Sequence, residues 1–180
     1  MNMKEETLKK EIVYDGKIIT VRSDTARTPE GDIVPREVVE HPGGVGIAME
    51  DEEGKFFMVT QYRYAQECVT IEFPAGKKEY GEDPLTTAKR EIVEETGYEG
   101  TDFVYLGKMF PTPAYDSEVV DFYYTKKGAY RGQHLDADEY LNLSRMSLDE
   151  IIDAAVEGKI PDAKTMCMAL LIQQMKARQK

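Results

Sequence analysis

Residues 83–97 constrain the fold most, because they mark both ends of a helix and give that helix a buried face. Asp83 followed by Pro84 is typical of an N-cap with proline at the first helical position. Gly97 is typical of the residue that ends a helix in a left-handed conformation. Between these ends, apolar or small side chains recur at helical spacing, at Leu85, Ala88, Ile92 and Thr96. The sequence therefore predicts a helix over 84–96 with one buried side.

A second face of this predicted helix carries three glutamates. Glu91 and Glu94 are three residues apart and Glu91 and Glu95 are four apart, so at about 100° per residue they lie side by side. Like charges at these spacings repel, by about a few tenths of a kcal/mol per pair on an exposed helix. Mg²⁺ turns this repulsion into attraction, because it prefers oxygen ligands and binds a few carboxylates together with substrate phosphates. We predict a magnesium-dependent phosphate site here, with Glu82 as a more peripheral ligand.

A solvated acidic helix face is the ordinary explanation for such a run of charge. Here, however, seven single-residue choices from Gly76 to Gly97 fit the spacing G-x5-E-x7-R-E-U-x-E-E-x-G-U, in which U is a bulky apolar residue. Chance agreement is on the order of 10⁻⁸ per window. The pattern resembles the signature of the Nudix hydrolases. The matching arginine of that family orients a catalytic glutamate, so the resemblance implies that Arg90 holds a carboxylate rather than touching the substrate.

Length and composition restrict the classes of protein to which this chain can belong. At 180 residues and 41% hydrophobic content, it fits one ordinary domain with a small appended subdomain. No apolar run approaches the length of a membrane span and no signal peptide is visible, so we expect no membrane partner. Cys68 and Cys167 are the only cysteines and lack metal-ligand spacing, so a disulfide scaffold is not expected and a reducing cytoplasm fits. The net charge of −11 argues against nucleic acid as a partner, because phosphate backbones are bound by Lys and Arg.

The rest of the chain combines short strand-like runs with two further helices. A capping box from Ser147 to Glu150 begins a helix that ends near Gly158. Asp162, in a D-A-K-T segment similar to a helix start of the family, caps a final helix with an expected stripe of Ala163, Met166, Leu170 and Met175. Asp15-Gly16 is typical of a two-residue hairpin turn. Strand-like runs cover 10–14, 17–26, 33–41, 44–50, 55–62, 69–73, 103–110, 119–125 and 139–143.

This order predicts an α/β (α+β) fold, a Nudix-type α/β/α sandwich with a mixed sheet and helices on both faces. A small N-terminal antiparallel β subdomain of about three strands precedes it. We assign residues 1–41 to this N-terminal unit and residues 42–180 to the Nudix catalytic domain. A small sheet needs a partner surface, so we expect the N-terminal unit to dimerise.

The resemblance extends upstream of the signature to the ADP-ribose pyrophosphatases of the Nudix family. The segment E-F-P-A-G looks like their E-x-P-A-G, in which the alanine carbonyl is a metal ligand, so the resemblance implies this role for Ala75. The segment Q-Y-R, ending at Arg63, is similar to a strand whose arginine contacts the substrate. Arg36 matches a second substrate arginine more loosely. The resemblance thus implies substrate contacts at Arg63, Arg36 and Glu72.

Two downstream loops also resemble this subgroup. The segment 110–118 is similar to its S-P-G-x-x-[DS]-E loop, although threonine and alanine replace the usual serine and glycine. The resemblance implies that Pro113 and Glu118 form a rim near the pyrophosphate or the terminal ribose. The acidic stretch 135–140 resembles a loop with a catalytic or metal-linked glutamate. Glu139 matches that glutamate best, and a shift of one residue would give Asp138 instead.

The activity implied by the resemblance is hydrolysis of the diphosphate of ADP-ribose to AMP and ribose 5-phosphate. Two or three Mg²⁺ ions, with Mn²⁺ as a substitute, would lie among the Ala75 carbonyl, Glu91, Glu95 and Glu94 and neutralise charge on the diphosphate. A carboxylate accepts a proton from the attacking water, either Glu139 or a glutamate of the signature. The resemblance also implies a homodimer in which Arg36 serves the neighbouring subunit's site.

Three alternatives remain open from the sequence. The substrate could be another nucleoside diphosphate sugar or another linked nucleotide, because the signature handles only the diphosphate. Some Nudix folds are non-catalytic ligand sensors, and the loss of signature glutamates that marks them is not seen here. An interaction protein with a structural metal is a third class, but such sites prefer Cys and His ligands. The histidines His41 and His134 are far apart in the sequence.

Overall fold

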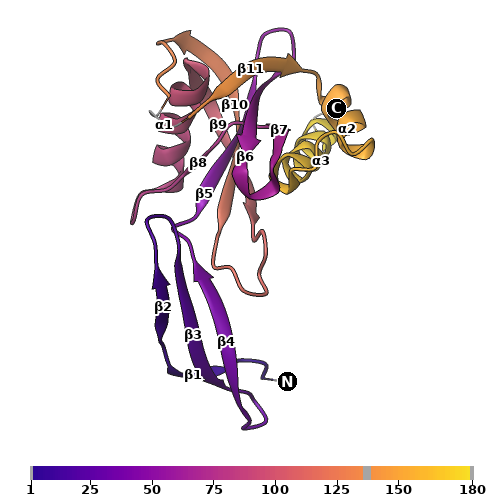
Figure 1. The fold of residues 1–180 in the computed structure, drawn as a ribbon. Helices are drawn as coiled ribbons and strands as arrows, with labels where there is room; N and C mark the ends of the chain where they lie inside the picture. The colour runs from indigo at the N-terminus through magenta and orange to yellow at the C-terminus, as the bar shows by residue number, and fades with distance from the viewer. Residues whose placement is uncertain (1, 136–138, 179–180) are drawn as a thin grey trace. The chain divides into compact units, whose positions relative to one another are not determined.

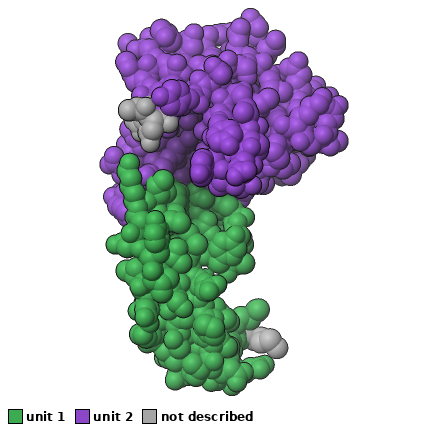
Figure 2. Space-filling view, viewed as in Figure 1, with its two compact units in different colours: residues 1–43, 110–119 green, residues 44–109, 120–180 purple. Residues whose placement is uncertain are grey.

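The computed structural model describes residues 2–135 and 139–178. They form two compact units, shown in two colours in Figure 2. The first unit contains residues 1–43 and 110–119, and the second contains residues 44–109 and 120–180. Residues 110–119 fall within the predicted Nudix domain, whereas the structure groups this segment with the N-terminal strands. The reason is a set of backbone hydrogen bonds within the first unit, described below.

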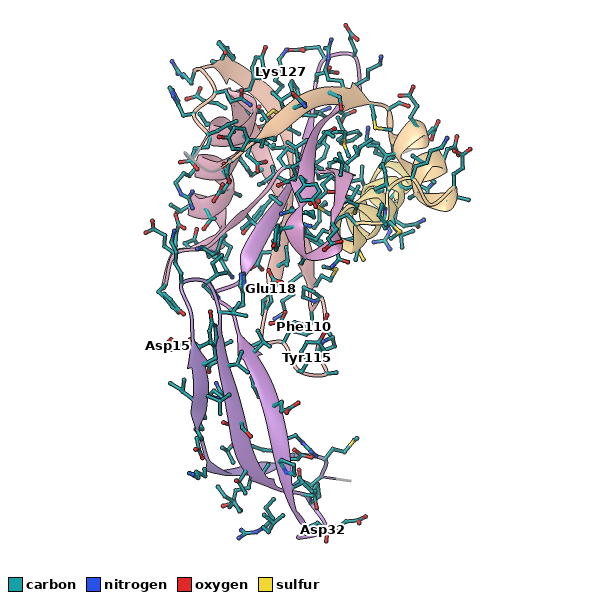
Figure 3. The ribbon with its side chains drawn as sticks, viewed as in Figure 1. Asp15, Asp32, Phe110, Tyr115, Glu118 and Lys127 are labelled. Atoms are coloured by element: carbon teal, nitrogen blue, oxygen red, sulfur yellow. The ribbon has the colours of Figure 1, made fainter. Side chains whose placement is uncertain are left out.

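The first unit is an antiparallel sheet of four strands, where the sequence predicted about three (Figure 1). The strands are β1 (Glu6–Lys9), β2 (Ile12–Asp15), β3 (Thr20–Arg27) and β4 (Ile33–Glu40). β4 pairs with the whole of β3, while β1 and β2 pair with opposite ends of β3. The β2–β3 connection is longer than the predicted two-residue turn, since Gly16 N–H donates to Ile19 O at 3.0 Å. Asp15 and Asp32 mark the two ends of this sheet (Figure 3).

Residues 110–119 add backbone hydrogen bonds to β4. Val39 N–H donates to Tyr115 O (2.7 Å), and Ser117 N–H donates to Val39 O (2.9 Å). Val39 and Asp116 form a parallel bridge. Phe110, Tyr115 and Glu118 are labelled on this segment in Figure 3. Because backbone donors and acceptors seek partners, a segment that supplies them to β4 belongs structurally with the N-terminal sheet.

The second unit is built on a mixed seven-stranded sheet. Its main path runs β11-β6-β5-β10-β9, with β7 beside β6 and β8 beside β5, and β10 pairs with β5 in parallel. The short β8 was not predicted. The strands are β5 (Gly44–Glu50), β6 (Phe56–Arg63), β7 (Cys68–Glu72), β8 (Ala75–Lys77), β9 (Tyr98–Met109), β10 (Val120–Tyr130) and β11 (Leu141–Met146).

Helices cover both faces of this sheet, as predicted (Figure 1). They are α1 (Pro84–Thr96), α2 (Leu148–Val156) and α3 (Ala163–Arg178). Alternation along β5 separates two cores: Val45, Ile47 and Met49 pack with Ala88 and Ile92 of α1, whereas Ala48 faces the cluster that holds α2 and α3. The structure is therefore the expected α/β/α sandwich with a mixed sheet.

The predicted helix ends are confirmed, but the stripe of the last helix is wrong. α1 spans the predicted residues, and Ser147 and Glu150 form the predicted capping box of α2. In α3 the buried residues are Thr165, Met168, Ala169 and Ile172, while Met166 and Leu170 of the expected stripe are exposed. The helix is apolar on several sides, so periodicity alone could not select the buried one. In the part of the chain that is described, no helix is long and apolar enough to cross a membrane.

Candidate active site

The acidic face belongs to α1, whose two ends are held as the sequence predicted. The Asp83 side chain accepts a hydrogen bond from Thr86 N–H at 3.1 Å, with Pro84 at the first helical position. Gly97 ends the helix with φ of 78°, a left-handed conformation that glycine adopts without steric cost. Between them the helix turns Glu91 and Glu95 inward against the strand β8, so both carboxylates are buried.

Glu91 lies directly against the backbone of Gly76 on β8. A Cβ atom added at Gly76 would stand 1.8 Å from Glu91 Cδ and 2.2 Å from each carboxylate oxygen. No residue larger than glycine fits there while the carboxylate keeps its position. Gly76, the first glycine of the signature, therefore leaves the space that the Glu91 carboxylate occupies.

Glu95 lies beside the adjacent residue of the same strand. Its Oε2 accepts a hydrogen bond from Ala75 N–H at 3.1 Å, and the residue is 3% exposed. Burial raises the pKa of Glu95 to about 8, with the charges of Glu91 and Glu139 acting in the same direction. Burial likewise raises the pKa of Glu91 to about 7, although Arg90 opposes that shift. Two carboxyl groups with raised pKa in one place indicate a site short of positive charge.

Arg90 supplies positive charge on the outer side of this group. Its Nη1 lies 2.8 Å from both Glu91 Oε1 and Glu94 Oε2, and its Nη2 lies 3.2 Å from Glu82 Oε2. Arg90 holds the pKa of Glu82 down at about 2. Burial of Arg90 acts to lower its own pKa, but these carboxylates raise it above the usual value. The arginine thus contacts carboxylates, which is the geometry that the sequence predicted for it.

The donor set suits a divalent cation. The carboxylates of Glu91, Glu94 and Glu95 come from one helix face, and the carbonyl of Ala75 belongs to the residue whose N–H binds Glu95. In the described ranges, no three His, Cys, Asp or Glu side chains stand close enough to hold a metal ion as they are. Arg90 occupies one oxygen of Glu91, so metal ligation by that oxygen requires this ion pair to open.

Arg63 and Glu72 pair with each other at one side of this site. Arg63 Nε and Nη2 donate to Glu72 Oε1 and Oε2 at 2.7 and 2.5 Å, a two-pronged ion pair. Lys164 Nζ lies 3.1 Å from Glu72 Oε2, and Thr70 Oγ1 also donates to this carboxylate. Burial alone would raise the pKa of Glu72, yet Arg63, Lys164 and Thr70 lower it to about 2. The charge of Glu95 also acts on Arg63.

A groove of about 740 Å³ opens beside this cluster. Both Arg63 and Glu72 line it, together with Asp162, which caps the start of α3. The sequence analysis did not single out Thr70, and it treated Lys164 only as part of a helix start. The signal for Lys164 was its place in the D-A-K-T segment, but its partner Glu72 is 92 residues away in the chain.

Glu139 is exposed, and its negative charge acts on Glu91 and Glu95. Its side chain therefore lies within electrostatic reach of the acidic face, on the second unit. Asp138, the alternative match for the family's loop glutamate, lies outside the described residues. The structure so brings together seven predicted site residues, namely Ala75, Glu82, Arg90, Glu91, Glu94, Glu95 and Glu139.

The other three predicted substrate residues belong to the first unit. Arg36 on β4 pairs with Glu5 at 2.6 Å and is exposed. Pro113 is exposed in a turn of the 110–119 segment. Glu118 lies 3.4 Å from His41 Nδ1, and it is also labelled in Figure 3.

Fold and site together define a Nudix protein. Residues 40–167 match the family model described as the NUDIX domain. Residues 5–39 match the model described as the nucleoside diphosphate sugar hydrolase N-terminal domain. The chain therefore belongs to the Nudix family, and the second model covers most of its N-terminal sheet.

Individual relatives resemble the chain over nearly its whole length. It is 36% identical to a methanol dehydrogenase activator of Bacillus methanolicus, over 96% of this chain and 95% of the relative. It is 32% identical to an ADP-ribose pyrophosphatase of Bacillus subtilis, over 99% of this chain and 97% of the relative. A solved structure described as an ADP compounds hydrolase shares the fold, with a TM-score of 0.85, 20% identity and coverage of 98% and 96% of the two chains.

Proposed function

We propose that this protein hydrolyses the diphosphate of ADP-ribose to AMP and ribose 5-phosphate, with Mg²⁺ bound at the acidic face of α1. The observation that carries the proposal is the pair of buried glutamates, Glu91 and Glu95, which pack on the backbone of Gly76 and Ala75. Buried carboxylates are costly unless a cation or hydrogen bonds compensate them. The full-length relative named ADP-ribose pyrophosphatase supports the choice of substrate.

Glu91, Glu95, Glu94 and the Ala75 carbonyl would hold the cation, and Glu82 would support it from the periphery. When bound, Mg²⁺ supplies positive charge against the diphosphate oxygens and makes water more acidic. The role of Arg90 is to orient Glu91 and Glu94 through the two 2.8 Å contacts of its Nη1.

Hydrolysis adds one water across the bond between a bridging oxygen and phosphorus. The water oxygen joins one phosphorus, the bond from that phosphorus to the bridging oxygen breaks, and the other phosphate leaves. A carboxylate must accept the proton that the water gives up. We assign this step to Glu139, with Glu94 as the alternative, because each of them adds negative charge to the surroundings of Glu91.

Arg63 is the substrate residue that we assign to the second unit. Arg63 lines the groove together with Glu72, which fixes the direction of its guanidinium through two hydrogen bonds. A planar guanidinium fits phosphate or paired hydroxyl oxygens. We also propose substrate contacts for Arg36, Pro113 and Glu118. Since Arg36 and Glu5 form an exposed ion pair, a substrate phosphate could replace Glu5 at little energetic cost.

We further propose that the protein is a cytoplasmic homodimer. Both cysteines are free, in agreement with a reducing compartment. Large apolar side chains are exposed on the N-terminal sheet, among them Ile12, Val13 and Tyr14, and they suit contact with a second copy. In such a dimer Arg36 would serve the site of the neighbouring subunit.

A second candidate function is supported by the relative named methanol dehydrogenase activator, which matches 96% of this chain. In that case the chain would act on another enzyme rather than on free ADP-ribose. Addition of the protein to a methanol dehydrogenase, with and without Mg²⁺, tests this directly. A rise in dehydrogenase activity without any release of AMP from ADP-ribose would favour the second candidate.

The deciding experiment is a substrate panel with the purified protein and Mg²⁺. The panel contains ADP-ribose, other nucleotide sugars, dinucleoside polyphosphates and NADH. We expect AMP and ribose 5-phosphate to appear from ADP-ribose far faster than products from the other compounds. Cleavage of another compound alone would support the proposed diphosphate hydrolysis but exclude ADP-ribose as the substrate. Binding without turnover of any compound would identify a ligand sensor.

A further inference from the structure

The segment that follows β10 is bonded to the C-terminal end of α1. Arg131 and Gly132 N–H both donate to Gly97 O, at 2.7 and 3.2 Å. His134 N–H donates to Glu94 O at 3.0 Å. The last carbonyl groups of a helix have no partner inside the helix, and here another part of the chain supplies the donors.

One side chain contributes to this contact. Gln133 Nε2 donates to Glu95 O at 2.6 Å. The contact is close: a Cβ atom added at Gly97 would stand 2.6 Å from the Tyr130 ring and 3.0 Å from Gln133 N. Tyr98 and Tyr130 pack their rings 4.9 Å apart just beside it. Residues 130–134 are therefore fixed against the end of α1 by backbone, side-chain and aromatic contacts.

The carbonyl groups that receive these bonds belong to residues of the acidic face. Glu94 and Glu95 direct their side chains to the candidate metal site and their backbone oxygens to the segment 133–134. Five residues after His134 the chain reaches Glu139, whose charge acts on Glu91 and Glu95. Five residues span at most about 17–18 Å, so an anchor at residue 134 limits where Glu139 can lie.

We infer that Gln133 is a positioning residue, which holds residues 130–134 against α1 and thereby limits the place of Glu139 at the acidic face. The inference rests on the proposed function, because Glu139 is the proton acceptor only if the site hydrolyses a diphosphate. Gln133 itself touches neither substrate nor metal ligand oxygens. Its contact is with a backbone carbonyl, which any side chain with a suitable N–H donor could satisfy.

Three substitutions separate this role from general support of the helix. Gln133→Leu removes the donor at similar size, and Gln133→Lys keeps an N–H donor that can reach Glu95 O. Arg131→Ala is the matched control in the same segment, because the Arg131 side chain pairs with Glu99 at 3.0 Å and not with α1. Each is measured alone and together with Glu139→Gln, so that the coupling between the two positions is obtained.

We expect Gln133→Leu to lower kcat by roughly 3- to 10-fold, the loss of about one hydrogen bond, with KM changed by less than about twofold. Gln133→Lys restores kcat, and Arg131→Ala leaves it unchanged. In the Glu139→Gln background, Gln133→Leu should have almost no further effect on kcat, because the carboxylate that Gln133 positions has already been removed. An equal loss of kcat in both backgrounds would overturn the inference and leave Gln133 as a cap of α1.

Hydrogen exchange without substrate gives a readout that does not depend on activity. The amides of Arg131, Gly132 and His134 are bonded to carbonyls of Glu94 and Gly97. We expect Gln133→Leu to speed their exchange about tenfold and Arg131→Ala to leave it unchanged. Unchanged exchange in Gln133→Leu overturns the inference even in an active enzyme. A wild-type protein that hydrolyses nothing, but shows this exchange effect, overturns the proposed function alone.

Discussion

At residue 76 the backbone and a carboxylate share a space that no larger side chain can enter. Gly76 keeps φ out of the left-handed region, so its backbone does not require glycine. The requirement comes from Glu91, whose carboxylate occupies the position of a Cβ atom. The geometry of the candidate site therefore depends on a residue that contributes no functional group.

We predict that Gly76→Ala lowers kcat by about 10²-fold or more while the protein remains folded. The new methyl group would meet Glu91 Cδ at 1.8 Å, and the glutamate must leave its place. Gly81→Ala, in the segment between β8 and α1, is the control. It has open space around Cβ and a φ of +80°, so it costs about 1–2 kcal/mol of backbone strain. Equal activities of the two variants would contradict the proposed position of Glu91.

For Glu95→Gln we predict a folded protein that loses both turnover and stabilisation by Mg²⁺. Glutamine can still accept the hydrogen bond from Ala75 N–H, but it cannot ionise to give the carboxylate that would bind the cation. Thermal melting with EDTA and with Mg²⁺ measures this. Saturating Mg²⁺ stabilises the wild type, by about 2.7 kcal/mol at 100 times the dissociation constant, and should leave the variant unaffected. A Mg²⁺-dependent rise of melting temperature in Glu95→Gln would remove Glu95 from the metal site.

At the scale of elements, one ion cluster connects two strands and a helix. Arg63 ends β6, Glu72 ends β7 and Lys164 begins α3. The Glu72 carboxylate at the centre is only 1% exposed and receives bonds from all sides. A buried carboxylate in such a cluster contributes to stability only while it is ionised.

We predict that the free energy of unfolding falls between pH 5 and pH 2 partly through Glu72. Its folded-state pKa of about 2 lies below its ordinary value of 4.5, so its contribution is present above pH 4.5 and is lost as the pH falls through 2. The contribution is at most about 3 kcal/mol. Urea unfolding of wild type and Glu72→Gln across this range measures it. The difference between the two proteins should shrink with falling pH, and a constant difference would refute the assignment.

Whether a helix or strand could be predicted depends on whether the residues that define it are close together in the sequence. The ends of α1 were predicted to the residue because Asp83, Pro84 and Gly97 carry their own capping chemistry. β1 escaped prediction because its four residues are all exposed and show no buried face. β8 has three residues, too few for any period. These two strands are defined by backbone pairing with distant segments, which sequence periodicity does not contain.

The same distinction holds within the candidate site. The resemblance of the signature implied that Arg90 holds a carboxylate, and Arg90 Nη1 contacts Glu91 and Glu94, which lie on the same helix. Gln133 reaches Glu95 across 38 positions of sequence and was not singled out. Spacing also could not reveal that Arg63 and Glu72 bind each other. In the register of β6 and β7, Arg63 stands opposite Cys68 and Glu72 opposite Val59, so the contact depends on the reach of the arginine side chain.

At the scale of the whole molecule, the two units differ in how well they cover their apolar side chains. The second unit has two buried cores, one on each face of its sheet. On β1 and β2 of the first unit, by contrast, every residue is exposed, Ile12, Val13 and Tyr14 included. A four-stranded sheet without a covering layer gains stability from a partner surface.

We predict that Val13→Lys converts the protein from a dimer to a monomer at micromolar concentration. A charged side chain in the centre of an apolar interface is costly to bury. Sedimentation or gel filtration measures the effect. The control is Val156→Lys at the end of α2, where a valine of even greater exposure, 83%, belongs to the second unit. A wild type that is already monomeric, or a control that dissociates equally, would contradict a dimer through the N-terminal sheet.

The hydrogen bonds between β4 and residues 110–119 have a practical consequence for recombining this protein with its relatives. A chimera that exchanges only the first 43 residues would place a β4 strand from the relative beside the native Tyr115 and Ser117. These two residues bond to the backbone of Val39 in the native β4. The exchangeable module is discontinuous: it consists of the N-terminal sheet and ten residues from the middle of the chain. Grafting both pieces together keeps the backbone hydrogen bonds between β4 and residues 110–119, whereas grafting one piece alone separates their partners.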